Sequence, residues 1–359
     1  MVAPRKRWTR LLSVSACAVV LIGVIGSPTD ASNAPTRLSY SVRHLPLDQN
    51  QDPPNAVSCT PSGLCIAITY GGDIFELSGT RYVPAVATGS SVTAVSCPTN
   101  SFCAVVGGSS NAMILRPRGI SAYPLNFGYF NSAVHWESVS CPSPSFCMAG
   151  GGIIQGPNSG AGVIATWDGR RWSVAKVVDP YLATDTHTFI SSMSCTSPTF
   201  CVAADGNDRT LQWNGAKWSF PPRLNSPATN DSFDISCTSS TFCLALGQAS
   251  KDVFSWNGHS WRRRSPSPFN NNYLDISCIT TTFCVAVEDE GKASFWNGRK
   301  WSPALTVDPN NYFNAVSCSS AWVCEAVGSN DDFVYLHISR KTPHLPLMCT
   351  TFRCQSTTV

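Results

Sequence analysis

A short cysteine motif recurs along the chain and constrains its fold more than any other feature. An apolar residue, a serine and a cysteine stand together, and a second cysteine follows six positions after the first. The pairs are Cys59/Cys65, Cys97/Cys103, Cys141/Cys147, Cys195/Cys201, Cys237/Cys243, Cys278/Cys284 and Cys318/Cys324. Successive first cysteines are 38, 44, 54, 42, 41 and 40 residues apart. Seven copies at this period indicate a repeat architecture in which each copy is one supersecondary unit.

One unit, residues 274–305, indicates what each repeat builds. The alternating segment 274–278 and the apolar segment 283–287 predict two β-strands. Residues 293–296 predict a third strand, and Asn297-Gly298 predicts a hairpin leading into a fourth at 300–304. Four short strands in about 40 residues make one propeller blade. We therefore predict an all-β, seven-bladed β-propeller over residues 35–342, with four antiparallel strands per blade.

The two ends of the repeat region complement one another. Residues 333–337 supply a third strand for the last repeat, but no Trp-led fourth strand follows them. Residues 38–42 stand before Cys59 much as the expected fourth strand 300–304 stands before Cys318. We expect this N-terminal strand to complete the seventh blade, which removes open sheet edges.

The N-terminal 34 residues have the pattern of a secretory signal peptide. A basic start precedes the apolar run 11–25, and small residues follow it, with cleavage expected near Ala31 or Ala34. Cys17 raises the alternative of lipidation, but the apolar run continues past it, which favours its removal with the signal. We expect a secreted or cell-envelope protein without a membrane span in the mature chain.

Charge argues against nucleic acid as a partner. The whole chain has 25 basic and 22 acidic residues, and removing residues 1–34 leaves 21 of each. A neutral chain lacks the long-range field that attracts nucleic acid or an anionic bilayer. We expect a monomer, and no motif calls for a cofactor.

The paired cysteines of an exported chain predict disulfides. Residues opposed across a hairpin lie roughly 4.5–5.5 Å apart at Cα, which a disulfide can span. One disulfide per blade would join strands within a blade and leave neighbouring blades unlinked. The six histidines show no repeated relation to the cysteines, which argues against zinc. Cys349 and Cys354 have a different spacing, and we expect them to pair within a C-terminal tail, residues 343–359.

Two resemblances follow from these motifs. The Trp-Asp/Asn-Gly-x-x-Trp turns at 167–172, 213–218, 256–261 and 296–301 resemble those of Asp-box (sialidase-type) and kelch-like propellers. The Ser-Cys repeats over 38–340 resemble those of uncharacterised secreted actinobacterial propellers, which implies an architecture and no activity. Asp168 alone retains the acid of the Asp box, and the arginine cluster and Tyr/Glu pair of sialidases have no counterpart. The resemblance therefore implies no sialidase activity.

The two faces of such a propeller should differ in function. The cysteine hairpins and Trp turns share one face, whose uniformity suggests a scaffold, and the varied second-to-third loops and inter-blade links share the other. The candidate ligand-binding residues there are Tyr129, Trp136, Tyr181, His187, Phe233, Asp234, Tyr273, Asp275 and Tyr312. Aromatic and acidic groups suit a glycan, a peptide or a cell-surface protein. The alternative is that the aromatics fill seams between blades and the acids provide solubility.

Catalytic motifs are sparse. Asp234 and Asp275 occupy inner-strand positions where other repeats have Ala or Ser, and a carboxyl pair could serve a glycoside hydrolase or lyase. The glycine-rich segment 150–156 lacks the Lys-Ser/Thr of a phosphate loop, and we expect it to form a surface loop of the third blade. Nucleophile-elbow and His-Glu-x-x-His motifs are missing from the sequence. A non-enzymatic binding module is favoured, with the enzyme as the alternative.

Overall fold

A computed structural model describes most of the repeat region. The described residues are 37–46, 52–78, 81–108, 111–125, 134–156, 159–179, 189–224, 226, 231–264, 273–310, 312–321, 323–328 and 332–341. The expected signal peptide, Cys17, Cys349, Cys354 and the expected tail lie outside this part of the chain.

The described residues form 28 strands in seven four-stranded antiparallel sheets, which we number along the chain. Sheet 1 contains β2 (Pro54–Cys59), β3 (Cys65–Thr69), β4 (Asp73–Ser78) and β5 (Arg81–Ala87). Sheet 2 contains β6 (Ala94–Thr99), β7 (Phe102–Val106), β8 (Asn111–Arg116) and β9 (Gly119–Pro124). Sheet 3 contains β10 (Val134–Ser143), β11 (Phe146–Gly156), β12 (Ser159–Trp167) and β13 (Lys176–Asp179).

The remaining sheets repeat this order. Sheet 4 contains β14 (Ile190–Ser197), β15 (Phe200–Asp205), β16 (Thr210–Trp213) and β17 (Trp218–Ser219). Sheet 5 contains β18 (Phe233–Ser239), β19 (Phe242–Gly247), β20 (Val253–Trp256) and β21 (Trp261–Arg264). Sheet 6 contains β22 (Tyr273–Thr280), β23 (Phe283–Glu288), β24 (Lys292–Trp296) and β25 (Leu305–Thr306), with a 3-10 turn at Asp289–Gly291.

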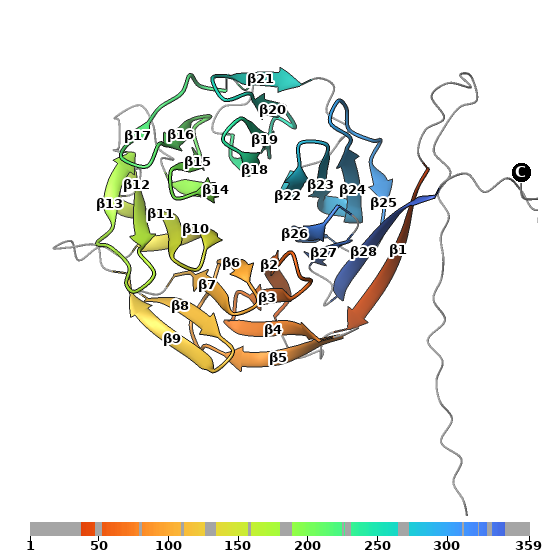
Figure 1. The fold of residues 1–359 in the computed structure, drawn as a ribbon, viewed down its shortest axis with the longest axis horizontal. Helices are drawn as coiled ribbons and strands as arrows, with labels where there is room; N and C mark the ends of the chain where they lie inside the picture. Colours follow the sequence, from red (N-terminus) through yellow and green to blue (C-terminus); the bar gives the residue numbers. More distant parts are fainter. Residues whose placement is uncertain are drawn as a thin grey trace, which may run out of the picture.

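Sheet 7 brings together both ends of the described chain. Its strand order is β1 (Arg37–Pro46), β28 (Asp332–Lys341), β27 (Val323–Gly328) and β26 (Phe313–Ser320). β1 runs antiparallel to β28, from Arg37 opposite Lys341 to Pro46 opposite Asp332. The N-terminal strand therefore lies on the outer edge of the sheet that the last repeat builds (Figure 1).

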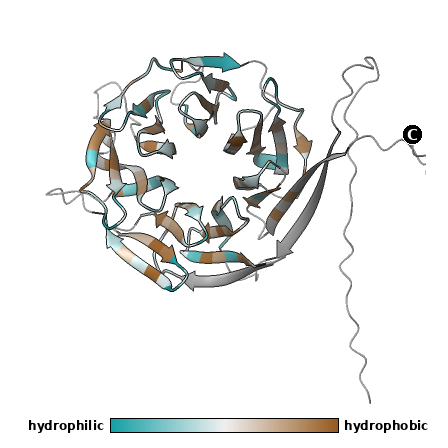
Figure 2. Ribbon diagram, viewed as in Figure 1, coloured by the Kyte–Doolittle hydropathy of each residue, from teal (hydrophilic) through white to brown (hydrophobic). Residues whose placement is uncertain are grey.

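The sheets surround a common axis, with β2, β6, β10, β14, β18, β22 and β26 innermost (Figure 1). Apolar residues alternate with polar ones along many of the strands, and the outer strand β21 is hydrophilic (Figure 2). The predicted all-β propeller with four-stranded antiparallel sheets is confirmed. One expected strand differs: Trp301 forms only an isolated bridge with Trp296, and β25 begins at Leu305 rather than within 300–304.

The core lies between neighbouring sheets. Ile66 and Ile68 of sheet 1 pack with Val95 and Val105 of sheet 2 in one buried cluster, and Met148 of sheet 3 packs with Met193 of sheet 4 in another. Ala residues of the second strands are fully buried, as expected where sheets press together: Ala67, Ala149, Ala203, Ala245, Ala286 and Ala326. Burial of these faces holds the sheets in a ring.

A disulfide joins the first two strands of each sheet. The predicted bonds are present as Cys59–Cys65, Cys97–Cys103, Cys141–Cys147, Cys195–Cys201, Cys237–Cys243, Cys278–Cys284 and Cys318–Cys324. Both cysteines of each bond belong to the same sheet. The disulfides therefore leave the sheets unlinked to one another, as predicted.

The spacing across these disulfides is shorter than the sequence predicted. The Cα atoms lie 3.9–4.1 Å apart in all seven bonds. The expected value was roughly 4.5–5.5 Å, the separation of directly opposed residues in an unlinked antiparallel pair. The covalent bond holds the two strands closer than backbone pairing alone does, which corrects the distance and leaves the pairing unchanged.

The Trp turns are held by their Asn or Asp side chain. In sheet 5, Asn257 Oδ1 accepts hydrogen bonds from the N–H groups of His259 at 3.0 Å and Ser260 at 2.9 Å. Gly258 has φ +94°, a conformation that favours glycine. Trp256 Nε1 donates to the carbonyl of Ser240 in the cysteine hairpin at 3.0 Å. This bond places the Trp turn and the cysteine hairpin on the same face.

The expected glycine-rich loop is instead part of a strand, which corrects the prediction for residues 150–156. Gly150, Gly151 and Gly152 lie within β11. A Cβ at Gly151 would lie 2.1 Å from the carbonyl oxygen of His135, and one at Gly152 would meet the ring of Phe189. Glycine is required here by close packing, because any side chain would collide with the neighbouring strand or the ring.

Candidate functional site

The serine of the repeated motif joins each sheet to the next. Ser58 Oγ of sheet 1 accepts a hydrogen bond from the N–H of Cys97 in sheet 2 at 2.9 Å. The same bond runs from Cys141 to Ser96, Cys195 to Ser140, Cys237 to Ser194, Cys278 to Ser236 and Cys318 to Ser277. We call these bonds the first layer. They supply the contact between sheets that the disulfides do not.

The first layer closes on itself. Cys59 N–H of sheet 1 donates to Ser317 Oγ of sheet 7 at 2.9 Å, across 258 residues of sequence. The seventh seam thus carries the same bond as the other six. Sequence reasoning missed this role, although the presence of serine in every copy of the motif was the signal for it.

The cysteines that the sequence predicted as disulfide residues serve the scaffold and not a reactive site. The second cysteine of each pair lies in the core, with at most 4 % of its surface exposed: Cys65, Cys103, Cys147, Cys201, Cys243, Cys284 and Cys324. Each is bonded to the first cysteine of its own sheet, so none offers a free thiol. Nucleophilic or metal-binding chemistry at these positions would require the bond to open first.

A second layer lies two residues earlier on each inner strand, at the position just before the apolar residue of the motif. Its members are Ala56, Ala94, Ser138, Ser192, Asp234, Asp275 and Ala315. Ser192 Oγ accepts from Ile235 N–H in the next sheet at 3.0 Å. The two carboxyls that the sequence predicted as a pair thus stand in a layer whose chemistry changes from seam to seam.

Asp275 is held entirely by backbone groups. Its Oδ2 accepts from Val316 N–H of sheet 7 at 2.8 Å, and its Oδ1 accepts from Ile276 N–H at 2.7 Å. Asp234 has a different partner, because its Oδ2 accepts from Gln248 Nε2 at 3.1 Å. Both aspartates are half-buried. Asp275 is therefore a structural bridge across the seam between sheets 6 and 7.

The two carboxyls interact with each other electrostatically. Burial raises the pKa of Asp234 to about 6. Burial and then the charge of Asp234 raise the pKa of Asp275 to about 8. Because two neighbouring carboxyls titrate as a unit, these values belong to the pair, which holds a proton near neutral pH.

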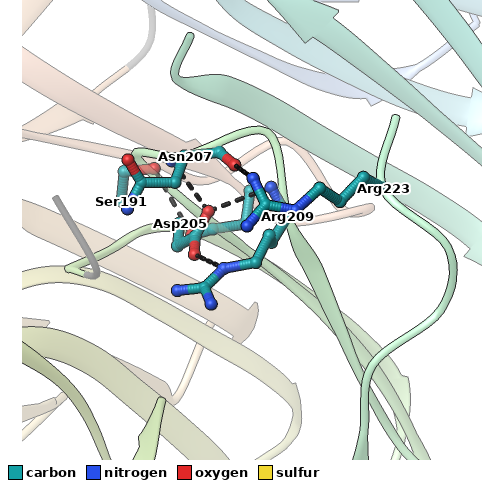
Figure 3. A network of polar contacts seen from close by, with 6 residues as sticks. Ser191, Asp205, Asn207, Arg209 and Arg223 are labelled. Carbon is teal, nitrogen blue, oxygen red and sulfur yellow. Dashed lines mark hydrogen bonds and ion pairs between the residues drawn. The ribbon is translucent and has the colours of Figure 1, made fainter. Parts of the chain in front are cut away.

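The second-to-third loop of sheet 4 carries a buried ion pair (Figure 3). Asp205 Oδ2 contacts Arg209 Nε at 2.6 Å, and its Oδ1 accepts from the N–H groups of Asn207 at 2.8 Å and Arg209 at 3.0 Å. Arg223 Nη1 donates to the Asn207 carbonyl at 3.2 Å. One carboxyl therefore fixes the path of this loop, and the loop in turn holds Arg223.

The link between sheets 4 and 5 is tied to loops on both sides. Asp231 accepts from Ala249 N–H at 2.8 Å and Ser250 N–H at 3.2 Å, both in the loop of sheet 5. Asp208 N–H donates to the Asp231 carbonyl at 3.4 Å. Burial, followed by the charge of Asp231, raises the pKa of Asp208 to about 6. These contacts place the inter-sheet links and second-to-third loops on one face, opposite the cysteine hairpins.

Among the described residues, the aromatic side chains predicted to bind a ligand do not share one site. Trp136 and Phe233 are fully buried in the packing between sheets, where no ligand reaches them. Tyr312 is 55 % exposed on the link before β26. Tyr273 begins β22, and Tyr129, Tyr181 and His187 lie outside the described residues. For Trp136 and Phe233 the structure matches the alternative in which aromatics fill the seams.

A hollow of about 530 Å³ lies on the opposite face, between the hairpins of sheets 1 and 2. Pro61, Ser62, Pro98, Thr99, Asn100 and Ser101 line it. Asn100 Oδ1 accepts from the Thr60 hydroxyl at 2.5 Å and the Ser62 hydroxyl at 2.6 Å, which joins the two hairpins. The hollow carries no charged side chain and was not predicted.

Within the described residues, no three His, Cys, Asp or Glu side chains gather in a way that could hold a metal ion. In the same part of the chain, no helix has the length and apolar character needed to cross a membrane.

Solved structures similar to this chain are propellers of differing function. A streptogramin B lyase aligns with a TM-score of 0.67 and 11% identity, over 84% of this chain and 98% of the lyase. A catalytically inactive virginiamycin B lyase from Staphylococcus aureus with quinupristin aligns with a TM-score of 0.62 and 10% identity, over 83% and 99%. The WD40 repeats of RRP9 align with a TM-score of 0.63 and 12% identity, over 83% and 97%.

No protein-family model and no curated protein sequence matches the chain. At these identities the structural likenesses establish the propeller fold alone, because one fold supports many functions.

Proposed function

We propose that this chain is an exported, non-enzymatic recognition propeller of seven blades, closed by its N-terminal strand. It binds a glycan, a peptide or a cell-surface partner on the face formed by the inter-blade links and second-to-third loops. Seven intrachain disulfides support export, because such bonds persist in oxidising compartments. The pairing of β1 with β28 and the bond from Cys59 to Ser317 support closure.

The observation that carries this proposal is the difference between the two faces. On the hairpin face, the Asn or Asp of each Trp turn makes the same pair of bonds, as in sheets 4 and 6. On the loop face, sheets 4 and 5 differ in the groups that their carboxyls hold in place. Asp205 holds Arg209, Asp252 holds Arg263, and Asp231 accepts the backbone N–H of Ala249. Prior ordering of polar groups lowers the entropic cost of binding.

The inner carboxyls support binding more than catalysis. Both oxygens of Asp275 already accept backbone N–H groups, so the fold uses this carboxyl to join strands. A carboxylate that holds two strands together is a poor candidate for a nucleophile, because reaction would break those bonds. In this proposal Asp275 therefore stabilises the ring and does not react with a ligand.

A lyase or glycoside hydrolase is the second candidate. The raised pKa values of Asp234 and Asp275 bracket neutral pH, which suits general acid-base chemistry. A lyase also stands among the solved propellers of similar shape. In this alternative Asp234, with one oxygen on Gln248, is the acid or base.

The test joins binding and turnover on the same ligands. Purified mature protein is applied to a glycan array, to a peptide library and to cell surfaces, and each binding sugar is then assayed for cleavage. Asp208→Asn on the loop face should weaken binding about tenfold, and Asp168→Asn on the hairpin face is the matched control. Binding without turnover supports the proposal. Turnover that Asp234→Asn abolishes would overturn it in favour of the enzyme.

A further inference from the structure

The second layer contains one seam that breaks its own pattern. Ser192 of sheet 4 accepts from Ile235 N–H of sheet 5, and Asp275 of sheet 6 accepts from Val316 N–H of sheet 7. Between sheets 5 and 6, Asp234 occupies the acceptor position and Ile276 N–H the donor position. Ile276 N–H instead donates to Asp275, its neighbour on the same strand, at 2.7 Å.

Two carboxyls therefore occupy acceptor positions for one amide, and only Asp275 accepts from it. Asp275 holds Ile276 N–H from within β22, and Asp234 stands across the seam, where the serine that bonds Ile235 stands one seam earlier. The carboxyls are close enough for the charge of Asp234 to act on Asp275. Asp234 Oδ2 instead accepts a hydrogen bond from Gln248 Nε2 at 3.1 Å.

Hydrogen bonding decides where the pair holds its proton. Both oxygens of Asp275 accept N–H groups, which favours the charged carboxylate. Hydrogen bonding therefore places the proton of the pair on Asp234, which accepts only the Gln248 amide among the bonds in the described residues. The pKa values of about 6 and about 8 are those of the two ionisations of the pair and do not belong to either residue alone. When Asp234 also ionises, the two charges repel, and Asp234 needs a donor. The amide in register with it is Ile276 N–H.

We propose that Ile276 N–H alternates between Asp275 of its own strand and Asp234 of sheet 5, with the ionisation of the carboxyl pair selecting the acceptor. The seam between sheets 5 and 6 thus has two hydrogen-bonded states. With one proton on the pair, the amide stays within β22. With none, it crosses the seam and completes the second layer. This inference concerns the ring and does not depend on the proposed binding function.

Other titratable groups lie on the strands packed against β18 and β22. Glu288 ends β23 opposite Tyr273, and its Oε1 is 3.8 Å from Lys292 Nζ. Asp205 ends β15 and is paired with Arg209. In the described residues, strands β14, β19 and β26 carry no charged side chain. Glu288 lies on the strand paired with β22, so it supplies the control.

The test follows three isoleucine amides of the intact mature protein. Uniform ¹⁵N-isoleucine labelling reports Ile276, Ile235 and Ile66 in one spectrum, recorded from pH 5 to pH 9. The Ile276 amide shift should change between about pH 6 and about pH 8, the interval spanned by the carboxyl pair. Ile235 follows Asp234 in the chain and reports the ionisation of that carboxyl, whereas the buried Ile66 of sheet 1 should stay constant. A flat Ile276 resonance would overturn the proposal.

Variants identify the acceptor. In Asp234→Ser, a hydroxyl replaces the carboxyl as in Ser192, so Ile276 should lose its pH dependence above pH 6. Glu288→Gln should leave that dependence unchanged. A crystal structure of the wild-type protein at pH 9 supplies a direct readout that needs no variant. Ile276 N within hydrogen-bond distance of Asp234 supports the switch, and Ile276 N still on Asp275 refutes it.

Discussion

The two hydrogen-bond layers of the inner strands differ in how strictly they repeat. In the first layer every seam has a serine hydroxyl accepting from a cysteine N–H, including the seam between Ser317 and Cys59. In the second layer, two residues away, the position holds Ala, Ser or Asp. The first layer supplies the same contact at every seam, so the second layer can vary without opening the ring. The first layer is therefore part of the scaffold, and the second layer gives each seam its own side chains.

The largest effect is expected from removing the disulfides. Each closes a loop of about seven residues and should contribute about 2 kcal/mol to the free energy of unfolding by chain-entropy reasoning. Seven together contribute about 14 kcal/mol, which is comparable to the whole free energy of unfolding of a typical domain. Full reduction should therefore abolish the cooperative thermal transition, followed by calorimetry with and without reductant. A reduced protein with an unchanged transition would mean that the first layer alone suffices.

Breaking one bond of the first layer should cost the same at any seam. Ser194→Ala leaves the Cys237 N–H without its acceptor, and Ser96→Ala does so for Cys141. An unpaired buried amide costs about 1–3 kcal/mol. Urea unfolding should give similar losses for the two variants. Losses that differ severalfold would contradict the equivalence of the seams.

The second layer should make stability depend on pH. The carboxyl pair of Asp234 and Asp275 titrates with pKa values of about 6 and about 8 in the folded protein, against an ordinary value of 3.8 for each carboxyl. The folded chain therefore holds a proton that the unfolded chain releases, and the free energy of unfolding falls as pH rises from about 4 to about 8. Asp234→Asn should reduce this slope in urea titrations. A slope that does not change would show that the pair is uncoupled in solution.

The smallest effect concerns an indole without a partner. Trp261 Nε1 of sheet 5 donates to Thr210 Oγ1 of sheet 4 at 3.0 Å, whereas the buried Trp172 Nε1 of sheet 3 has no partner in the described residues. The register of sheet 2 places Ala112 where Thr210 stands in sheet 4. Ala112→Thr should raise the free energy of unfolding by about 1 kcal/mol. Ala112→Val, of the same shape, is the control and should gain nothing from hydrogen bonding.

Much of the fold followed from local chemistry. The cysteine spacing predicted every disulfide that the structure describes, because partners six residues apart lie opposite each other across a hairpin whatever surrounds them. Asn257-Gly258 predicted a turn because the two residues tolerate and cap its backbone. The loop expected at residues 150–156 is wrong, because the need for glycine there comes from His135 on β10 and from Phe189 just before β14.

The candidate site was predicted from the sequence less well than the fold. Asp234 and Asp275 stood out because they replace Ala or Ser in a repeat, and the structure does couple them. Trp136 and Phe233 are expected beside them on the inter-blade links, yet both lie in strands and are buried. The sequence does not distinguish an aromatic side chain that displays its ring from one that fills a seam, because the distinction depends on the neighbouring sheet.

The sequence by itself determined the repeat unit, its four strands and its internal disulfides, since these contacts join residues close together in the chain. Only the tertiary structure decided how the units meet. Contacts such as Cys59 with Ser317 and Asp275 with Val316 join residues 258 and 41 positions apart. Their geometry is set by the packing of whole sheets around the axis, so no local pattern of residues could specify which hydroxyl or carboxyl each amide would meet.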